Sequence, residues 1–173
     1  MEEKLGIIVV YQLRANAGVL LDLHLSMIEQ NTTLPYTIYG STNKLNPEFL
    51  DRISTHPNIK ICSCPTTSLN GSMEHSYYLS RLVKMAVEDN ATLICTLHVD
   101  SFPVTYGWDK KLLKLLTPSI AFVTLKKINT ACVFFRSEFY QKYQPAFFPD
   151  QQVRNNKAFQ EYLNNSGMID HSG

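Results

Sequence analysis

The stretch Leu93–Leu97 is apolar at every position but one, and it leads directly into His98 and Asp100 before Pro103. A run without a polar face predicts a strand buried on both sides, as in parallel sheets. The C-terminal end of such a strand is where open α/β sheets place their ligand crevice. Because side chains alternate along a strand, an imidazole and a carboxylate two residues apart can meet one ligand or metal ion. The sequence equally allows Asp100 to cap the following turn and His98 to be a satisfied interior histidine.

Apolar runs and helical patterns alternate along the rest of the chain. We expect strands at 5–11, 36–39, 58–63 and 93–100, with helices at 19–30, from 46, and at 74–88 between them. This alternation predicts a parallel sheet with right-handed crossovers. After Asp100 we expect a helix at 110–116, strands at 119–125 and 131–135, and helices at 138–143 and 153–163. The predicted fold class is α/β, with a central, mostly parallel sheet flanked by helices.

One helix start is marked by its residue types. Asn46 followed by Pro47 is typical of a helix that begins with asparagine as N-cap and proline at the first helical position. Phe49, Leu50 and Ile53 are then expected to form the inner face of this helix.

Length, charge and cysteine spacing exclude several classes of protein. A chain of 173 residues is expected to form one domain. Its net charge of +1, with acids and bases interspersed, predicts no nucleic-acid partner. No apolar run is long enough for a transmembrane segment and the N-terminus lacks a signal-peptide pattern, so we expect a cytoplasmic protein. Cys62 and Cys64 are spaced too closely for a zinc knuckle.

Three segments together resemble nucleotide-sugar glycosyltransferases with the GT-A fold, and bacterial family-2-type enzymes in particular. These enzymes commonly carry Asp-X-Asp at the end of the fourth strand, in a phrase similar to Leu-Asp-Ser-Asp-X-X-Pro. Here His98 stands in place of the first Asp, Asp100 in place of the second, and Pro103 follows. The segment 71–79 resembles the loop and helix start that precede this strand, and 131–136 resembles an apolar-Phe-Arg strand of the family. The likeness covers roughly residues 5–140 and implies a Rossmann-like GT-A fold.

The resemblance implies a divalent cation, Mn²⁺ or Mg²⁺, held by Asp100 with help from His98. A hard cation bound by a carboxylate and the donor's diphosphate stabilises the charge that develops as the glycosidic bond breaks. One carboxylate is enough for Mg²⁺, because substrate phosphates and water complete its coordination. An imidazole ligand favours Mn²⁺ over Mg²⁺. His98 is alternatively a hydrogen-bond donor to the sugar or diphosphate.

By the same resemblance, residues at the ends of the first strands hold the donor. Besides Asp100, the candidates for nucleotide-sugar binding are Val10, Tyr11, Gln12, Ser41, Ser72 and His75. Tyr11 is expected to stack on the base. The family often places an acid at the end of the second strand, where this chain has Ser41. Ser72 and His75 approach the diphosphate from a helix start, where free amides favour anions; alternatively Ser72 only caps that helix.

The residues on the acceptor side of the site are expected to come after Asp100 in the sequence. Trp108 offers a flat apolar face for a sugar ring, with a partly buried core anchor as the alternative. Arg136 ends the strand that, by resemblance, lies beside the acceptor. An inverting transferase needs a general base, and Asp150 and Asp170 are the candidates, with an exposed loop acid and a tail residue as the alternatives.

These observations predict one GT-A-like domain over 1–173, with a nucleotide-binding half at 1–104 and an acceptor-side half at 105–173 that is minimal or truncated. The expected function is transfer of a sugar from a nucleotide sugar to a glycan or another acceptor. The alternative is a non-catalytic domain of the same fold that binds a sugar nucleotide or glycan. A Rossmann dehydrogenase or methyltransferase is disfavoured, because no glycine lies in the turn directly after the first strand.

Overall fold

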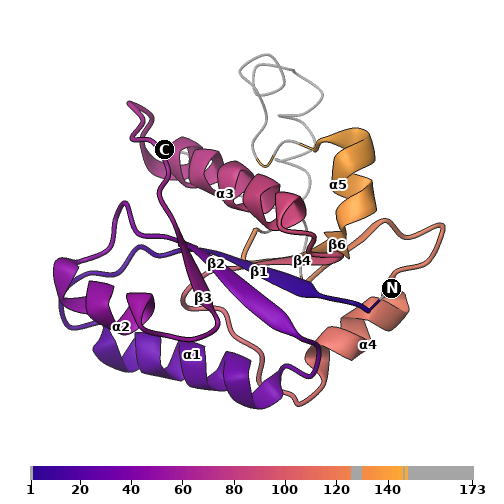
Figure 1. The fold of residues 1–173 in the computed structure, drawn as a ribbon, viewed down its shortest axis with the longest axis horizontal. Helices are drawn as coiled ribbons and strands as arrows, with labels where there is room; N and C mark the ends of the chain where they lie inside the picture. The colour runs from indigo at the N-terminus through magenta and orange to yellow at the C-terminus, as the bar shows by residue number, and fades with distance from the viewer. Residues whose placement is uncertain (1, 126–129, 146, 148–173) are drawn as a thin grey trace, which may run out of the picture.

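The computed structural model describes residues 2–125, 130–145 and 147, which form one six-stranded sheet covered by helices (Figure 1). The strands are β1 (Leu5–Val10), β2 (Tyr36–Ser41), β3 (Ile59–Cys62), β4 (Leu93–Leu97), β5 (Phe122–Thr124) and β6 (Cys132–Arg136). Their order across the sheet is β3-β2-β1-β4-β6-β5. The first four strands are parallel, and β6 and β5 are antiparallel to their neighbours. The predicted α/β class with a mostly parallel sheet is therefore confirmed.

Helices cover both faces of the sheet. They are α1 (Gly18–Asn31), the 3₁₀ turn η1 (Pro47–Phe49), α2 (Leu50–Ser54), α3 (Gly71–Glu88), α4 (Trp108–Leu115) and α5 (Ser137–Tyr143). Figure 1 shows α1, α2 and α4 on one face and α3 and α5 on the other. Among the helices that the structure describes, none is long and apolar enough to cross a membrane.

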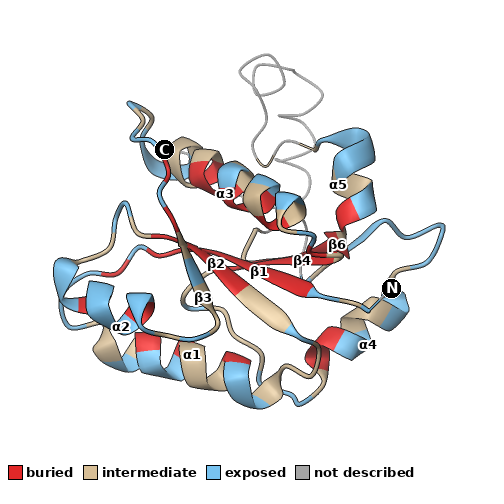
Figure 2. Ribbon diagram, viewed as in Figure 1, coloured by how far each residue is buried: buried red, intermediate tan, exposed pale blue. Residues whose placement is uncertain are grey.

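The two central strands are apolar on both faces because each face meets a helical layer. All six residues of β1 and all five of β4 are buried, as the apolar runs predicted. Ile7 of β1 packs into the core on the α1 side, whereas Ile8 packs against α3. Figure 2 shows these buried strands between helices whose outer faces are exposed.

Element ends differ from the sequence predictions by a few residues. β4 ends at Leu97, three residues before the predicted strand end, because the chain turns at His98. The predicted strand 119–125 is ordered as a strand only over Phe122–Thr124. The side chain of Asn46 accepts a hydrogen bond from the backbone N–H of Glu48, which confirms the predicted cap.

Burial of the helix faces also departs from prediction in one place. Phe49 and Ile53 are buried as expected, but Leu50 is 43% exposed. The predicted inner position of Leu50 was wrong because a 3₁₀ turn opens this segment, which changes the angular spacing of the residues that follow. The predicted helix at 153–163 lies outside the described residues.

The parallel order fixes where a site can lie. β1, β2 and β4 end at the same edge of the sheet, hereafter the carboxyl edge, and the strand order reverses between β1 and β4. Such a reversal is where open α/β sheets bind ligands. β6 runs antiparallel to β4 and pairs Arg136 with Leu93, so it ends at the opposite edge.

Candidate functional site

The turn after β4 places His98 and Asp100 at the carboxyl edge. The backbone N–H of Ser101 donates to the carbonyl of His98 at 2.9 Å, which closes the turn. Asp100 is exposed, and within the described part of the chain its carboxylate accepts no hydrogen bond. This observation disfavours the alternative in which Asp100 only caps the turn. The carboxylate is open to a ligand.

His98 belongs to a cluster formed by three separate segments. Its ring meets that of His75, from the second turn of α3, edge to face at a centroid distance of 4.9 Å. The Nε2 of His98 lies 3.1 Å from Oγ1 of Thr130, a residue that the sequence analysis did not single out. His98 is half-buried, which sets it apart from a histidine enclosed in the core.

Burial shifts both imidazoles toward the neutral form. Burial, together with the neighbouring His98, lowers the pKa of His75 to about 4. Burial also lowers the pKa of His98, although the charge of Asp100 acts in the opposite direction. Each ring therefore has one N–H and one lone pair, and can offer either a hydrogen bond or a metal ligand.

Tyr11 does not present a ring face at this edge, contrary to the predicted stacking on a base. Its side chain is fully buried and packs over Gly40 of β2. A Cβ added at Gly40 would lie 2.7 Å from the Tyr11 ring, so only glycine leaves room for it. Burial raises the pKa of Tyr11, and its hydroxyl has no hydrogen-bond partner among the described residues. The sequence could not show whether the ring after β1 turns inward.

Of the other candidates at the ends of β1 and β2, only Gln12 has an exposed side chain. Val10 is buried as the last residue of β1. Ser41 is also buried, and its hydroxyl donates to Oδ1 of Asn43 at 2.8 Å. Asn43 in turn donates to the carbonyl of Cys64 at 3.0 Å. Ser41 therefore orders the loop after β2 and does not face solvent.

His24 of α1 is a buried polar group that the sequence analysis missed. Its side chain is fully buried, lies edge-on to Tyr11 at 6.0 Å, and neither ring nitrogen is hydrogen-bonded in the described part of the chain. Burial lowers the pKa of His24 to about 4, although the nearby backbone of Val99 and the charge of Asp100 act in the opposite direction. Helical spacing would have found this residue, because Leu21, His24 and Ile28 share one face of α1.

The start of α3 forms another wall of the carboxyl edge. Asn70 occupies the N-cap position and Ser72 lies within the first turn, so the alternative in which Ser72 caps the helix is wrong. Ser72 is exposed. Lys44, from the loop after β2, forms an ion pair with Glu74 at 3.2 Å, which joins that loop to the helix. The lysine is half-exposed and was not predicted.

Trp108 and Arg136 do not lie beside His98. The indole N–H of Trp108 donates to Oγ1 of Thr32, just past the end of α1, at 3.1 Å. Because α1 runs back from the carboxyl edge, Thr32 lies at the opposite edge. Trp108 and Arg136 were expected to flank an acceptor beside Asp100, and their placement at the opposite edge does not match that expectation. Trp108 is buried and packs in the core, which agrees with the alternative to sugar binding.

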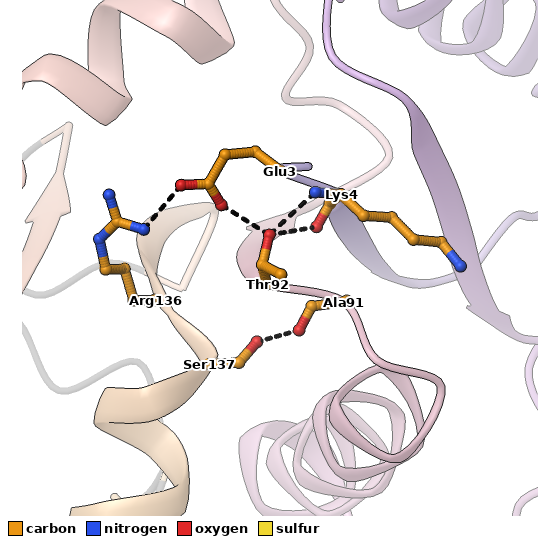
Figure 3. Close-up of polar contacts among 6 residues, drawn as sticks. All are labelled: Glu3, Lys4, Ala91, Thr92, Arg136 and Ser137. Atoms are coloured by element: carbon orange, nitrogen blue, oxygen red, sulfur yellow. Dashed lines mark hydrogen bonds and ion pairs between the residues drawn. The ribbon is translucent and has the colours of Figure 1, made fainter. Parts of the chain in front are cut away.

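Arg136 belongs to a polar network at the opposite edge (Figure 3). Its guanidinium pairs with Glu3 at 2.8 Å, and Glu3 accepts a hydrogen bond from Thr92 at 2.7 Å. Ser137 donates to the carbonyl of Ala91. These contacts link the segments that precede β1 and β4 to the end of β6. Arg136 also lines a cavity of about 250 Å³ together with residues of α5.

At the carboxyl edge, the described residues offer Asp100 and His98 as a pair of metal ligands. No group of three or more histidine, cysteine, aspartate or glutamate side chains suited to a metal occurs within residues 2–125, 130–145 and 147. Asp100 and His98 lie in one turn, and their chemistry suits a cation that takes its remaining ligands from phosphate and water. The predicted base candidates Asp150 and Asp170 lie outside the described residues.

Comparison with known proteins identifies the fold. No protein-family model and no curated protein matches the chain. Among solved structures, a mannosyltransferase from Pyrobaculum calidifontis in complex with GDP-Man and Mn²⁺ matches at a TM-score of 0.61 and 12% identity. The match covers 87% of this chain and 49% of the mannosyltransferase, so the chain spans about half of that protein.

For two further solved structures, the match covers a larger share of the other protein. A 4-diphosphocytidyl-2C-methyl-D-erythritol synthase matches at a TM-score of 0.56 and 10% identity, over 98% of this chain and 87% of the synthase. Mouse xyloside xylosyltransferase 1 matches at a TM-score of 0.53 and 8% identity, over 100% of this chain and 79% of the xylosyltransferase. The chain thus has the GT-A fold of nucleotidyl- and glycosyltransferases, as its sequence motifs predicted.

Proposed function

We propose that the chain is a nucleotide-sugar-dependent glycosyltransferase that moves a sugar from a nucleoside-diphosphate donor to a glycan or another acceptor. The observation that carries this proposal is the exposed Asp100 carboxylate in the turn after the central strand β4, which accepts no hydrogen bond from the described residues. An open α/β sheet binds its ligand at this edge. The GT-A fold supports the proposal, since the similar structures include a mannosyltransferase and a xylosyltransferase.

The donor nucleotide lies over the ends of β1 and β2 in this proposal. Gln12 contacts the base with its exposed side chain, while Val10 and Tyr11 contribute only backbone groups because their side chains are buried. Ser41 acts by ordering the loop after β2. The diphosphate lies against the start of α3, where Ser72 and His75 meet an anion near the positive end of the helix dipole.

Asp100 and His98 would hold a divalent cation, Mn²⁺ or Mg²⁺, that neutralises charge on the diphosphate. The fit rests on the chemistry of the two groups, which are an exposed carboxylate and an imidazole with one ring nitrogen that forms no hydrogen bond with a described residue. When bound, such a cation stabilises the charge that develops on the leaving diphosphate. The imidazole favours Mn²⁺, the ion present in the mannosyltransferase structure.

The acceptor side of the proposed site lies in the second half of the chain. Residues 1–104 form the donor half and 105–173 the acceptor half, as the sequence predicts. A general base removes the proton of the acceptor hydroxyl in an inverting reaction. Asp150 and Asp170 are the proposed candidates for that role. Trp108 and Arg136 are omitted from the proposal because they lie at the opposite edge of the sheet.

A specific observation favours a second candidate function. A histidine replaces the first acid of the family motif, and the described residues supply no third metal ligand near Asp100. A GT-A domain that has lost catalysis but still binds a sugar nucleotide or glycan would have the same features. Binding of the donor without turnover would distinguish this alternative from the transferase.

Thermal unfolding with a panel of nucleoside diphosphates and their sugars, with and without Mn²⁺, tests the proposal. A ligand at 100 times its Kd stabilises the native state by about 2.7 kcal/mol, which raises the Tm of a domain of this size by roughly 5–11 °C. Release of sugar from the same donors is measured in parallel. If no nucleotide raises the Tm, the proposed function is wrong.

Two carboxylate variants sharpen the test. Asp100→Asn is expected to abolish the Mn²⁺-dependent part of the Tm increase. Glu138→Gln removes an exposed carboxylate at the start of α5, at the opposite edge, and is expected to leave the increase unchanged. Equal responses in the two variants would contradict the role of Asp100.

A further inference from the structure

We propose that Thr130 is a positioning residue for His98. In this arrangement the Nε2–H of His98 donates to the Thr130 hydroxyl, so that the Nδ1 lone pair is the one presented to the divalent cation. The inference rests on the proposed function, because it assigns a partner to one of the two cation ligands.

The first support is the way the His98 ring is held. Nε2 lies 3.1 Å from Oγ1 of Thr130, and no described residue forms a hydrogen bond with Nδ1. The ring of His75 meets that of His98 at 4.9 Å and 76°. The imidazole is thus fixed by a hydrogen bond on one side and an aromatic edge contact on another. Among the contacts with described residues, Nδ1 is the ring nitrogen that stays open to a ligand.

The second support is the way Thr130 itself is held. The hydroxyl of Thr96, buried within β4, donates to the backbone carbonyl of Thr130 at 2.7 Å. The same hydroxyl accepts a hydrogen bond from the backbone N–H of Val133 at 3.0 Å. Thr96 therefore anchors the main chain of Thr130 to the central strand, while the side chain of Thr130 remains available to His98.

The chemistry of histidine ligands makes this pairing meaningful. A neutral imidazole has one N–H and one lone pair, and the group bound to the N–H decides which nitrogen can bind a metal. Histidines that ligate metals almost always donate the other ring N–H to a carboxylate, a backbone carbonyl or water, and here a threonine hydroxyl takes that place. Loss of such a partner typically lowers metal affinity by about 10- to 100-fold. Thr130 occupies the position of this partner.

Matched variants separate the hydroxyl from the fold. Thr130→Val removes the hydroxyl at nearly constant shape, and Thr130→Ser keeps it. Both retain the backbone carbonyl that Thr96 uses, so neither removes the contact that anchors the loop. Thermal unfolding of both variants checks that the fold is intact. His98→Gln identifies the His98 signals in the NMR spectra.

Two measurements test the proposal without any donor. Long-range ¹H–¹⁵N spectra of the imidazole report which ring nitrogen carries the proton. Titration with MnCl₂ alone, followed by broadening of the His98 ring protons, reports cation affinity. We expect the Nε2–H tautomer in the wild type and in Thr130→Ser. We expect Thr130→Val to bind Mn²⁺ about 10- to 100-fold more weakly and to lose the tautomer preference.

The outcomes for this inference and for the proposed function can be told apart. An Nδ1–H tautomer in the wild type overturns the positioning role, and so does Mn²⁺ affinity in Thr130→Val equal to that in Thr130→Ser. If the tautomer and Mn²⁺ results hold but no nucleoside diphosphate binds the wild type, the positioning role stands and the transferase proposal falls.

Discussion

Gly40 of β2 provides the sharpest test of how the carboxyl edge is packed. A Cβ at this position would lie 2.7 and 2.9 Å from two ring atoms of Tyr11. Ordinary contact begins at 3.4 Å, so the ring must move by about 0.7 Å to admit a methyl group. Tyr11 is fully buried and lies against His24, so it has little room to move.

We therefore expect Gly40→Ala to lower the free energy of unfolding by about 1–3 kcal/mol, the usual cost of overpacking a core. For a domain of this size that corresponds to a Tm lower by roughly 2–12 °C. Urea unfolding measures the change directly. The backbone at Gly40 is an ordinary strand, so the loss arises from the side-chain collision and not from an unfavourable φ.

Gly18→Ala is the matched control. A Cβ there would approach the guanidinium of Arg52 at 3.2 Å, and this flexible, partly exposed end can move aside. Replacing Tyr11 by Leu should remove most of the penalty of Gly40→Ala in a double-mutant cycle. A Gly40→Ala variant within 0.5 kcal/mol of the wild type would refute the argument that the Tyr11 ring is locked in place.

Two further predictions concern buried polar groups. Burial holds the pKa of His24 at about 4, below its unfolded value near 6.5, so the unfolded state binds more protons between these pH values. Stability is expected to fall by up to about 3 kcal/mol as pH drops through this window, and His24→Leu should flatten that part of a pH series of urea midpoints. If the urea midpoints of His24→Leu depend on pH as those of the wild type do, the role of His24 in the pH dependence is wrong. Asp109 is fully buried and accepts hydrogen bonds from the backbone N–H groups of Thr33 and Leu34. Asp109→Ala leaves both donors without their acceptor and should cost about 2–4 kcal/mol in urea unfolding, and a loss below 1 kcal/mol would count against it.

Several features of the site depended on contacts that no local pattern encodes. Trp108 follows Asp100 by only eight residues, yet the intervening chain crosses to the opposite edge, where the side chain of Asn31 donates to the carbonyl of Pro103. Arg136 was placed by resemblance beside an acceptor, but the antiparallel pairing of β6 with β4 carries it away from His98. The exposure of Trp108 and Arg136 was therefore decided by tertiary contacts.

The sequence by itself determined the fold class, the burial of β1 and β4, and the position of His98 and Asp100 at the end of a central strand. Those properties follow from apolar periodicity and chain order, which are local in sequence. The tertiary structure alone decided that Tyr11 turns into the core and that Thr130 and His75 meet His98. These contacts join segments far apart in the chain, so their energies depend on packing that periodicity does not contain.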